Sequence, residues 1–124
     1  MIISKAKEVS GYTANTPCER TLKVLISPEL QGVKNIAVGM TIIAPGGRTS
    51  SHVHLKEEEP WYIVEGQGLL IVDGHEMKVE KDTVIVVLPG EYHQITNTGQ
   101  TEMKILWIYT PPGEEQKVIL KQHL

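Results

Sequence analysis

The chain has 124 residues, which allows one hydrophobic core and predicts a single domain over residues 1–124. Its formal net charge is −3, and its cationic residues are spread along the sequence, so we expect no nucleic-acid partner. Cys18 is the one cysteine, which excludes a disulfide within the chain. No apolar run reaches the roughly 18 residues of a membrane span, and the N-terminus lacks a signal-peptide pattern. We therefore expect a cytoplasmic protein without membrane contact.

Short runs of β-forming residues between turn residues predict an all-β sandwich or barrel. Residues 1–19 are an N-terminal arm or edge strand, and residues 111–124 are a C-terminal tail in which only 114–120 is a candidate helix. Asp73-Gly74 is the strongest hairpin signal. The predicted strands are 21–27, 35–44, 69–72, 75–80, 83–88 and 103–110, with a turn at 28–32.

Candidate metal ligands gather in one stretch of the chain. His52 and His54 are two residues apart in a β-favouring segment, and strand alternation points both imidazoles to the same side. A tight connection through 56–58 would bring the Glu59 carboxylate back beside them. Three candidate ligands therefore come from about one hairpin, and His93, just after a Pro-Gly turn, is a further one.

Two stretches of the sequence resemble the two motifs of the cupin superfamily. The first has the family spacing of glycine, two histidines, glutamate and glycine, at Gly46, His52, His54, Glu59 and Gly66. The second has a glycine three residues before a histidine and an asparagine four residues after it, at Gly90, His93 and Asn97. Two departures concern turn geometry, because Leu88 replaces the usual proline and Lys81-Asp82 replaces the usual glycine.

The resemblance spans roughly residues 35–110 and implies a single cupin domain, a jelly-roll β-barrel. It also implies one divalent metal ion in the barrel, bound by His52, His54, Glu59 and His93. Such nitrogen and oxygen donors suit iron, manganese, nickel, copper or zinc. Glu57 and Glu58 compete for the carboxylate role, but only Glu59 has both family spacings, so we interpret the other two as solvated turn residues. We expect His75 and His123 to be exposed and unrelated to the metal.

Strand alternation from the ligands predicts the walls of the barrel interior. On the last strand, Lys104 should face solvent, which turns Met103, Ile105, Trp107 and Tyr109 inward. The candidate substrate-pocket residues are Trp61, Ile63, Ile95, Trp107 and Tyr109, with Arg48 at the mouth. Most of them also suit an ordinary barrel core. Apolar and aromatic walls favour a small apolar or aromatic acid over a sugar, and Arg48 would meet its carboxylate.

Two functional hypotheses stay open. The first is a metal-dependent enzyme of dioxygenase, isomerase or lyase type that acts on a small organic molecule. The alternative is a binding or sensing module without turnover. A general acid or base near the metal would separate them, and the candidates are Tyr62, Tyr92, Gln94 and Tyr109.

The same alternation predicts an apolar outer face. Leu106 and Ile108 should point away from the barrel, and the run 84–88 is apolar on both faces. Contiguous exposed apolar surface marks interfaces, so we expect a homodimer, with Ile2-Ile3 adding a strand to the partner's edge. Alternatively, the arm or the segment 118–120 covers this surface within one chain.

Overall fold

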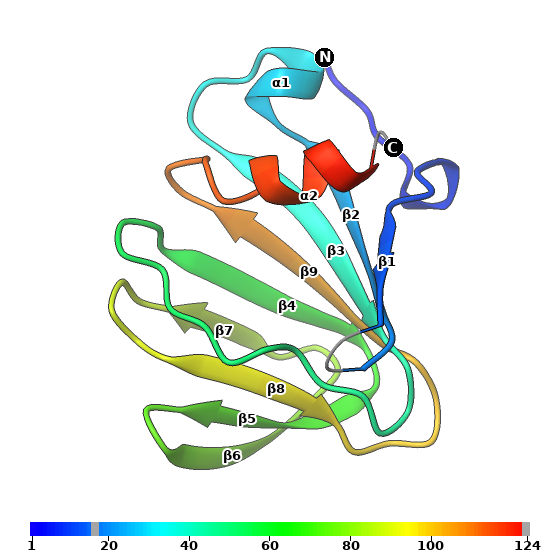
Figure 1. Ribbon diagram of the computed structural model, residues 1–124, viewed down its shortest axis with the longest axis vertical. Helices are drawn as coiled ribbons and strands as arrows, with labels where there is room; N and C mark the ends of the chain where they lie inside the picture. Colours follow the sequence, from blue (N-terminus) through cyan, green and yellow to red (C-terminus); the bar gives the residue numbers. More distant parts are fainter. Residues whose placement is uncertain (16–17, 123–124) are drawn as a thin grey trace.

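Two antiparallel sheets curve around one hydrophobic core (Figure 1). The computed structural model describes residues 1–15 and 18–122. The strands are β1 (Tyr12–Ala14), β2 (Arg20–Ile26), β3 (Ala37–Ile43), β4 (Glu59–Glu65), β5 (Gln67–Val72), β6 (His75–Glu80), β7 (Val84–Val87), β8 (His93–Asn97) and β9 (Met103–Tyr109). The larger sheet has the order β1-β2-β3-β9-β4-β7 and the smaller one β6-β5-β8. His123 lies outside the described residues.

Burial along the central strands follows the predicted period of two. On β4, Glu59, Trp61 and Ile63 are buried, while Tyr62 between them is exposed. The same alternation on β9 buries Met103 and the other inward positions, as predicted. Side chains of both sheets meet in one cluster, with Leu70 and Ile95 from the smaller sheet among residues of the larger one. The barrel interior is therefore the face that the alternation assigns.

The segment between β3 and β4 departs from the prediction. His52 and His54 do not lie on a strand, because residues 44–58 form only isolated bridges, including His52 with His93. Backbone hydrogen bonds still tie the segment to β8, for example from Thr49 N to Ile95 O at 3.0 Å. Gly46 adopts a φ of 78°, a turn conformation that breaks the pleat. The histidines are thus placed by an irregular segment that runs beside β8.

The predicted turn at 28–32 is a single helical turn, α1 (Pro28–Gln31). Ser27 accepts a hydrogen bond from Leu30 N at 3.1 Å, and Pro28 occupies the first turn. Gly32 ends the helix in the left-handed conformation, with φ at 76°. The prediction was wrong because the cap signals on both sides of the segment were interpreted as a turn alone.

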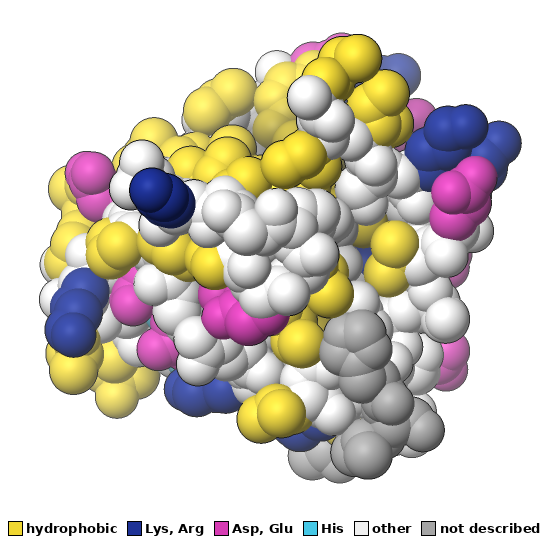
Figure 2. Space-filling model, turned by 90° about the horizontal axis from the view of Figure 1, so that it is seen from above, with side chains coloured by type: hydrophobic (Ala, Val, Ile, Leu, Met, Phe, Trp, Pro, Cys, Tyr) yellow, Lys and Arg dark blue, Asp and Glu magenta, His cyan; other side chains and the backbone are white. Residues whose placement is uncertain are grey.

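The chain termini cover one end of the barrel. A 3₁₀ helix (Ala6–Glu8) leads to β1, which pairs with β2 of the same chain rather than with a partner's edge. The C-terminal helix α2 (Gln116–Gln122) begins two residues later than predicted and buries Ile119 against the core. Figure 2 looks down on this end and shows hydrophobic side chains gathered across it. Among the described residues, no helix is long and apolar enough to cross a membrane.

Candidate metal centre and cavity

Four side chains from three segments converge inside the barrel. His52 and His54 come from the irregular segment, Glu59 from the start of β4 and His93 from the start of β8. One ligand atom of each lies within 4.8 Å of the others. The Glu59 Oε1 atom is 2.9 Å from His54 Nε2 and 3.5 Å from His93 Nε2. Folding alone therefore collects the residues that the motif spacing predicted as ligands.

Backbone carbonyls orient two of the imidazoles. The Nδ1 atom of His52 lies 2.8 Å from Ser50 O, and that of His93 lies 3.0 Å from Glu91 O. A carbonyl only accepts, so Nδ1 carries the proton in both rings. The Nε2 lone pairs are then available for a cation, which is the arrangement that fixes histidine tautomers at metal sites.

The centre contains buried polar atoms that lack hydrogen-bond partners. His54 Nε2, Glu59 Oε1 and His93 Nε2 are all inaccessible, and none makes a hydrogen bond within the described chain. The 2.9 Å approach of Glu59 to His54 is close in distance but lacks hydrogen-bond geometry, so it does not satisfy either atom. Buried polar groups cost free energy unless they are paired or coordinate a metal. The residues therefore fit a metal ion.

Ionisation states at neutral pH also favour a cation. Burial acts to raise the pKa of Glu59, but the adjoining nitrogens of His54 and His93 outweigh it and lower this pKa to about 2. Burial is the largest influence on His52 as well, and with the His93 charge it lowers the pKa of the imidazole. Glu59 is thus anionic and His52 neutral at pH 7. Both are in the protonation states that bind metal.

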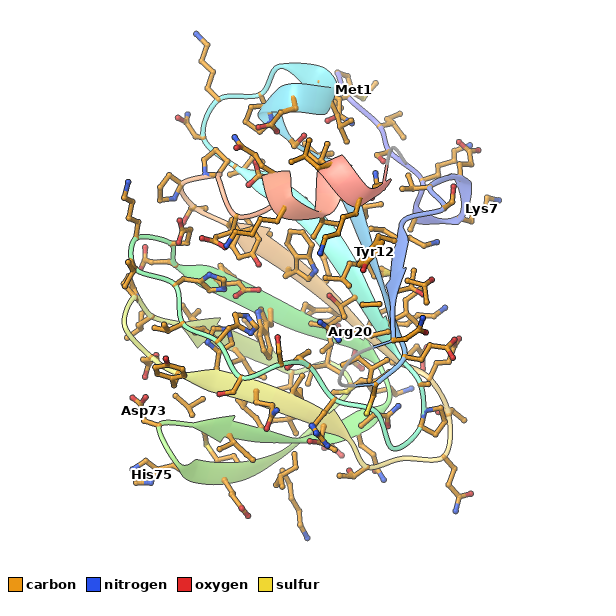
Figure 3. All side chains as sticks on the ribbon, viewed as in Figure 1. Met1, Lys7, Tyr12, Arg20, Asp73 and His75 are labelled. Carbon is orange, nitrogen blue, oxygen red and sulfur yellow. The ribbon has the colours of Figure 1, made fainter. Side chains whose placement is uncertain are left out.

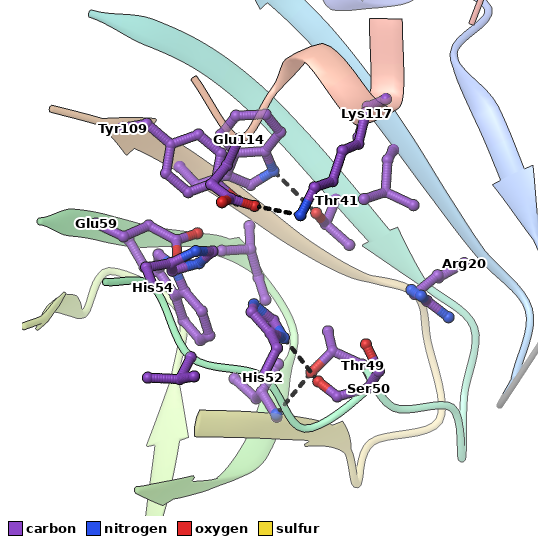
Figure 4. A pocket seen from close by; sticks show the side chains of 17 residues that line it. Arg20, Thr41, Thr49, Ser50, His52, His54, Glu59, Tyr109, Glu114 and Lys117 are labelled. Atoms are coloured by element: carbon purple, nitrogen blue, oxygen red, sulfur yellow. Dashed lines mark hydrogen bonds and ion pairs between the residues drawn. The ribbon is translucent and has the colours of Figure 1, made fainter. Parts of the chain in front are cut away.

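A cavity of about 290 Å³ adjoins the four side chains (Figure 4). The structure places Trp61, Ile95, Trp107 and Tyr109 in its lining, together with His52, His54 and Glu59. The indole of Trp107 is fixed by a 2.9 Å hydrogen bond from Nε1 to Thr41 Oγ1. The wall opposite the metal centre is therefore largely aromatic and apolar.

Two predicted pocket residues lie elsewhere. Arg48 is exposed and does not line the cavity, because the irregular segment turns it away from the interior. Ile63 faces inward as expected, but it is fully buried in the core and does not reach the cavity. The arginine that does line the cavity is Arg20 at the start of β2, across from His54 and Glu59 in Figure 4. Alternation along β2 from Leu22, a β-strand signal in the sequence, would have found it.

Of the four candidates for a general acid or base, only Tyr109 lines the cavity. Tyr62 lies on the outer face and donates a 2.5 Å hydrogen bond to Asp82. Tyr92 is exposed, and the Gln94 amide donates to Thr49 O at 2.9 Å. Burial, joined by the charges of neighbouring carboxylates, raises the pKa of Tyr109 well above its usual value. Its phenol is therefore a proton donor at neutral pH.

Sequence reasoning missed three charged residues at this site. Glu57 is buried, at 7% exposure, so its interpretation as a solvated turn residue was wrong. One of its carboxylate oxygens lies within 4.8 Å of ligand atoms of His54 and Glu114. Glu114 and Lys117 line the cavity from the C-terminal segment and pair at 3.0 Å. That segment follows the motifs, and no sequence signal tied it to the barrel interior.

The two remaining histidines outside the cluster are separate from it by position. His75 is exposed at the tip of the β5–β6 hairpin, as predicted, and points away from the barrel in Figure 3. The structure does not describe His123.

Comparisons with known proteins agree with this architecture. A family model described as the cupin domain matches residues 39–109. The chain is 35% identical to an uncharacterized protein of Methanocaldococcus jannaschii over 92 residues, 73% of each protein. It is 30% identical to the oxalate-binding protein of Thermotoga maritima over 82 residues, 66% of this chain and 68% of the relative.

Solved structures share the fold at lower identity. A protein of Thermotoga maritima, described as a predicted oxalate decarboxylase, superimposes with a TM-score of 0.81 at 23% identity. The match covers 90% of this chain and all of that one. The polyketide cyclase RemF of Streptomyces resistomycificus gives a TM-score of 0.75 at 20% identity, over 91% of this chain and 82% of the other. At such identities the likeness shows the fold alone.

Proposed function

Because the chain belongs to the cupin family, we propose that its barrel binds one divalent metal ion and carries out a metal-dependent reaction of a small organic acid. The observation that carries this proposal is the set of buried atoms without partners, His54 Nε2, Glu59 Oε1 and His93 Nε2. His52 completes the set, with its outer nitrogen held by Ser50 O. When bound, the ion would supply Lewis acidity toward a substrate oxygen.

The cavity supports the choice of substrate class. Its volume of about 290 Å³ admits only a small molecule, and its aromatic wall favours flat groups. Arg20 and Lys117 in the lining supply positive charge for a carboxylate. A relative that is 30% identical is named an oxalate-binding protein, which is consistent with a small acid as ligand.

Two groups in the lining can exchange protons, which favours an enzyme over a passive binding module. Tyr109 remains protonated at neutral pH, and Glu114 is a cavity carboxylate outside the proposed ligand set. The chemistry of small acids needs a proton donor or acceptor near the reacting atoms, and these residues are placed to provide it.

The experiment that tests the proposal uses protein purified without a histidine tag. Elemental analysis should find about one divalent metal per chain. The cobalt-substituted protein should then change its visible absorption when oxalate or acetohydroxamic acid is added, and glucose 6-phosphate should leave it unchanged. Absence of metal, or a response to sugar phosphates only, would contradict the proposal.

We also propose that the protein forms a homodimer through the outer face of the larger sheet. Met40, Leu106, Tyr62 and Val84 form a continuous row across four strands of that face. Val84 and Val86 are 66% and 49% exposed, which is unusual for aliphatic side chains on a strand. Neither terminus replaces this contact, because β1 lies at the other edge of the sheet and α2 covers the barrel end.

A further inference from the structure

A second hollow, beside the central cavity, has a distinct charge. It is a groove of about 240 Å³ between α2 and the strands β1 and β2, and we call it the α2 groove. Arg20, Lys117 and Lys121 line it. Among residues 1–15 and 18–122, no carboxylate lines this groove. Three cations around one hollow stand out in a chain whose formal net charge is −3.

The α2 groove and the central cavity are contiguous. Arg20, Leu22, Lys117 and Val118 belong to the lining of both hollows. Lys121 belongs to the groove alone, where its Nζ atom lies 4.9 Å from the centroid of the Tyr12 ring. The three cations are thus shared out between the outer groove and its junction with the cavity that holds the metal centre.

The walls of the groove strengthen the field of these charges. Ala14, Leu22 and Val118 supply apolar surface between the cations. A cleft with one sign of charge and apolar walls focuses its field and raises the local concentration of ions of opposite charge. A groove of this kind would draw in anions and deliver them at the side of the cavity opposite Glu59.

We infer that the α2 groove is the entrance by which small organic anions reach the metal centre, and that Lys121 guides them electrostatically. This inference rests on the proposed function, since it assigns a route to the same site. It selects the substrate by charge before any contact with the metal. A neutral ligand of similar size gains nothing from the groove.

The test compares charge reversal at two lysines in the cobalt-substituted protein. Lys121→Glu changes the groove, and Lys78→Glu makes the same change in net charge at an exposed position on β6, in the other sheet. Stopped-flow absorption follows the association of oxalate, a dianion, and of acetohydroxamic acid, which is uncharged at pH 7. Cobalt content and far-UV circular dichroism report whether each variant is folded and loaded.

We expect Lys121→Glu to slow oxalate association about threefold to tenfold at low ionic strength, and expect added salt to remove most of the difference. Lys78→Glu should have little effect, and acetohydroxamic acid should associate equally with all three proteins. An unchanged oxalate rate in Lys121→Glu overturns the entrance while leaving the proposed function intact, as does equal slowing of both probes. If neither probe alters the unsubstituted protein's spectrum, the proposed function fails and the entrance fails with it.

Discussion

Gly39 of β3 lies directly beneath the indole of Trp107, its register partner on β9. A Cβ atom at Gly39 would stand 2.2 Å from two carbons of that ring, so only glycine leaves room for the aromatic side chain. The same indole forms part of the cavity wall. The shape of the proposed substrate site therefore depends on a residue that never touches the cavity.

Gly39→Ala should destabilise the protein by about 1–3 kcal/mol, since the indole must shift or the strands must separate. The displaced ring would also alter ligand binding in the cavity. Urea denaturation measures the first effect, and titration of the cobalt-substituted protein with oxalate measures the second. Gly99→Ala is the matched control, because its Cβ meets only the flexible Gln67 side chain, at 3.3 Å. Equal stability of the two variants would contradict the packing argument.

The hydrogen bond that holds Trp107 can be removed without a change of shape. Thr41→Val keeps the volume but leaves the buried indole N–H unpaired, which should cost about 1–3 kcal/mol. Thr13→Val removes an exposed hydroxyl pair with Thr21 and should cost less than about 0.5 kcal/mol. Thermal or urea unfolding compares the two. A similar loss in both variants would show that the buried bond has no special weight.

The ligand assignment predicts which histidines matter for metal content. His54→Ala and His93→Ala should each weaken metal binding by more than about a hundredfold, because even outer-shell partners of ligands are worth roughly 10–100-fold. His75→Ala should leave the metal content unchanged, since that side chain is exposed at a distant hairpin. Elemental analysis and competition with a chelator give the values. Equal losses from all three would refute the assignment.

The pairing of Glu59 with His54 predicts the pH dependence of stability in the metal-free protein. The pKa of Glu59 falls from 4.5 to about 2 on folding, so its stabilising contribution is present above pH 4.5 and disappears toward pH 2. At His54 burial acts to lower the pKa, but the Glu59 carboxylate raises it above 6.5 overall. That contribution is complete below pH 6.5 and is lost as the pH rises through the raised pKa.

Glu59→Gln removes both contributions at once. The difference in unfolding free energy between the original and variant proteins should therefore be largest from about pH 4.5 to 6.5 and shrink on either side. Urea denaturation in the presence of a chelator, repeated across this range, measures it. A difference that stays constant with pH would show that the two side chains do not interact in this way.

The dimer proposal is tested at the most exposed part of the apolar face. Val84→Lys with Val86→Lys should weaken self-association at least about tenfold, because both charges would enter an apolar interface unpaired. Met77→Lys on β6 is the control, since Met77 is 50% exposed but lies in the other sheet. Sedimentation equilibrium reports the association, and metal content should stay constant. A monomer at tens of micromolar before any substitution would rule out the dimer.

The sequence predicted the parts of this molecule that follow local rules. Period-two burial identified the inward residues of β4 and β9, and motif spacing identified the four side chains that converge. Residues placed by irregular backbone were harder to assign. Arg48 follows a turn at Gly46, and that turn, rather than any strand period, decides where its side chain points.

Long-range packing accounts for the other misses. Glu57 is buried near Glu114, a residue 57 positions later in the sequence, and no local pattern reports such a contact. Lys117 reaches the cavity only because α2 folds back over the barrel end, where Gln122 accepts a 2.9 Å hydrogen bond from Val24 N. These contacts depend on tertiary structure, which a single sequence does not specify residue by residue.

The proposed ligands come from both sheets, since Glu59 begins β4 in the larger one and His93 begins β8 in the smaller one. An ion held between them would act as a rivet across the barrel, and the sheets could not part until a coordination bond broke. Its main effect would then be on the lifetime of the native state, because that bond must break before the chain opens. A chelator would shorten the protein's survival against proteases even under conditions where the metal-free chain remains folded at equilibrium.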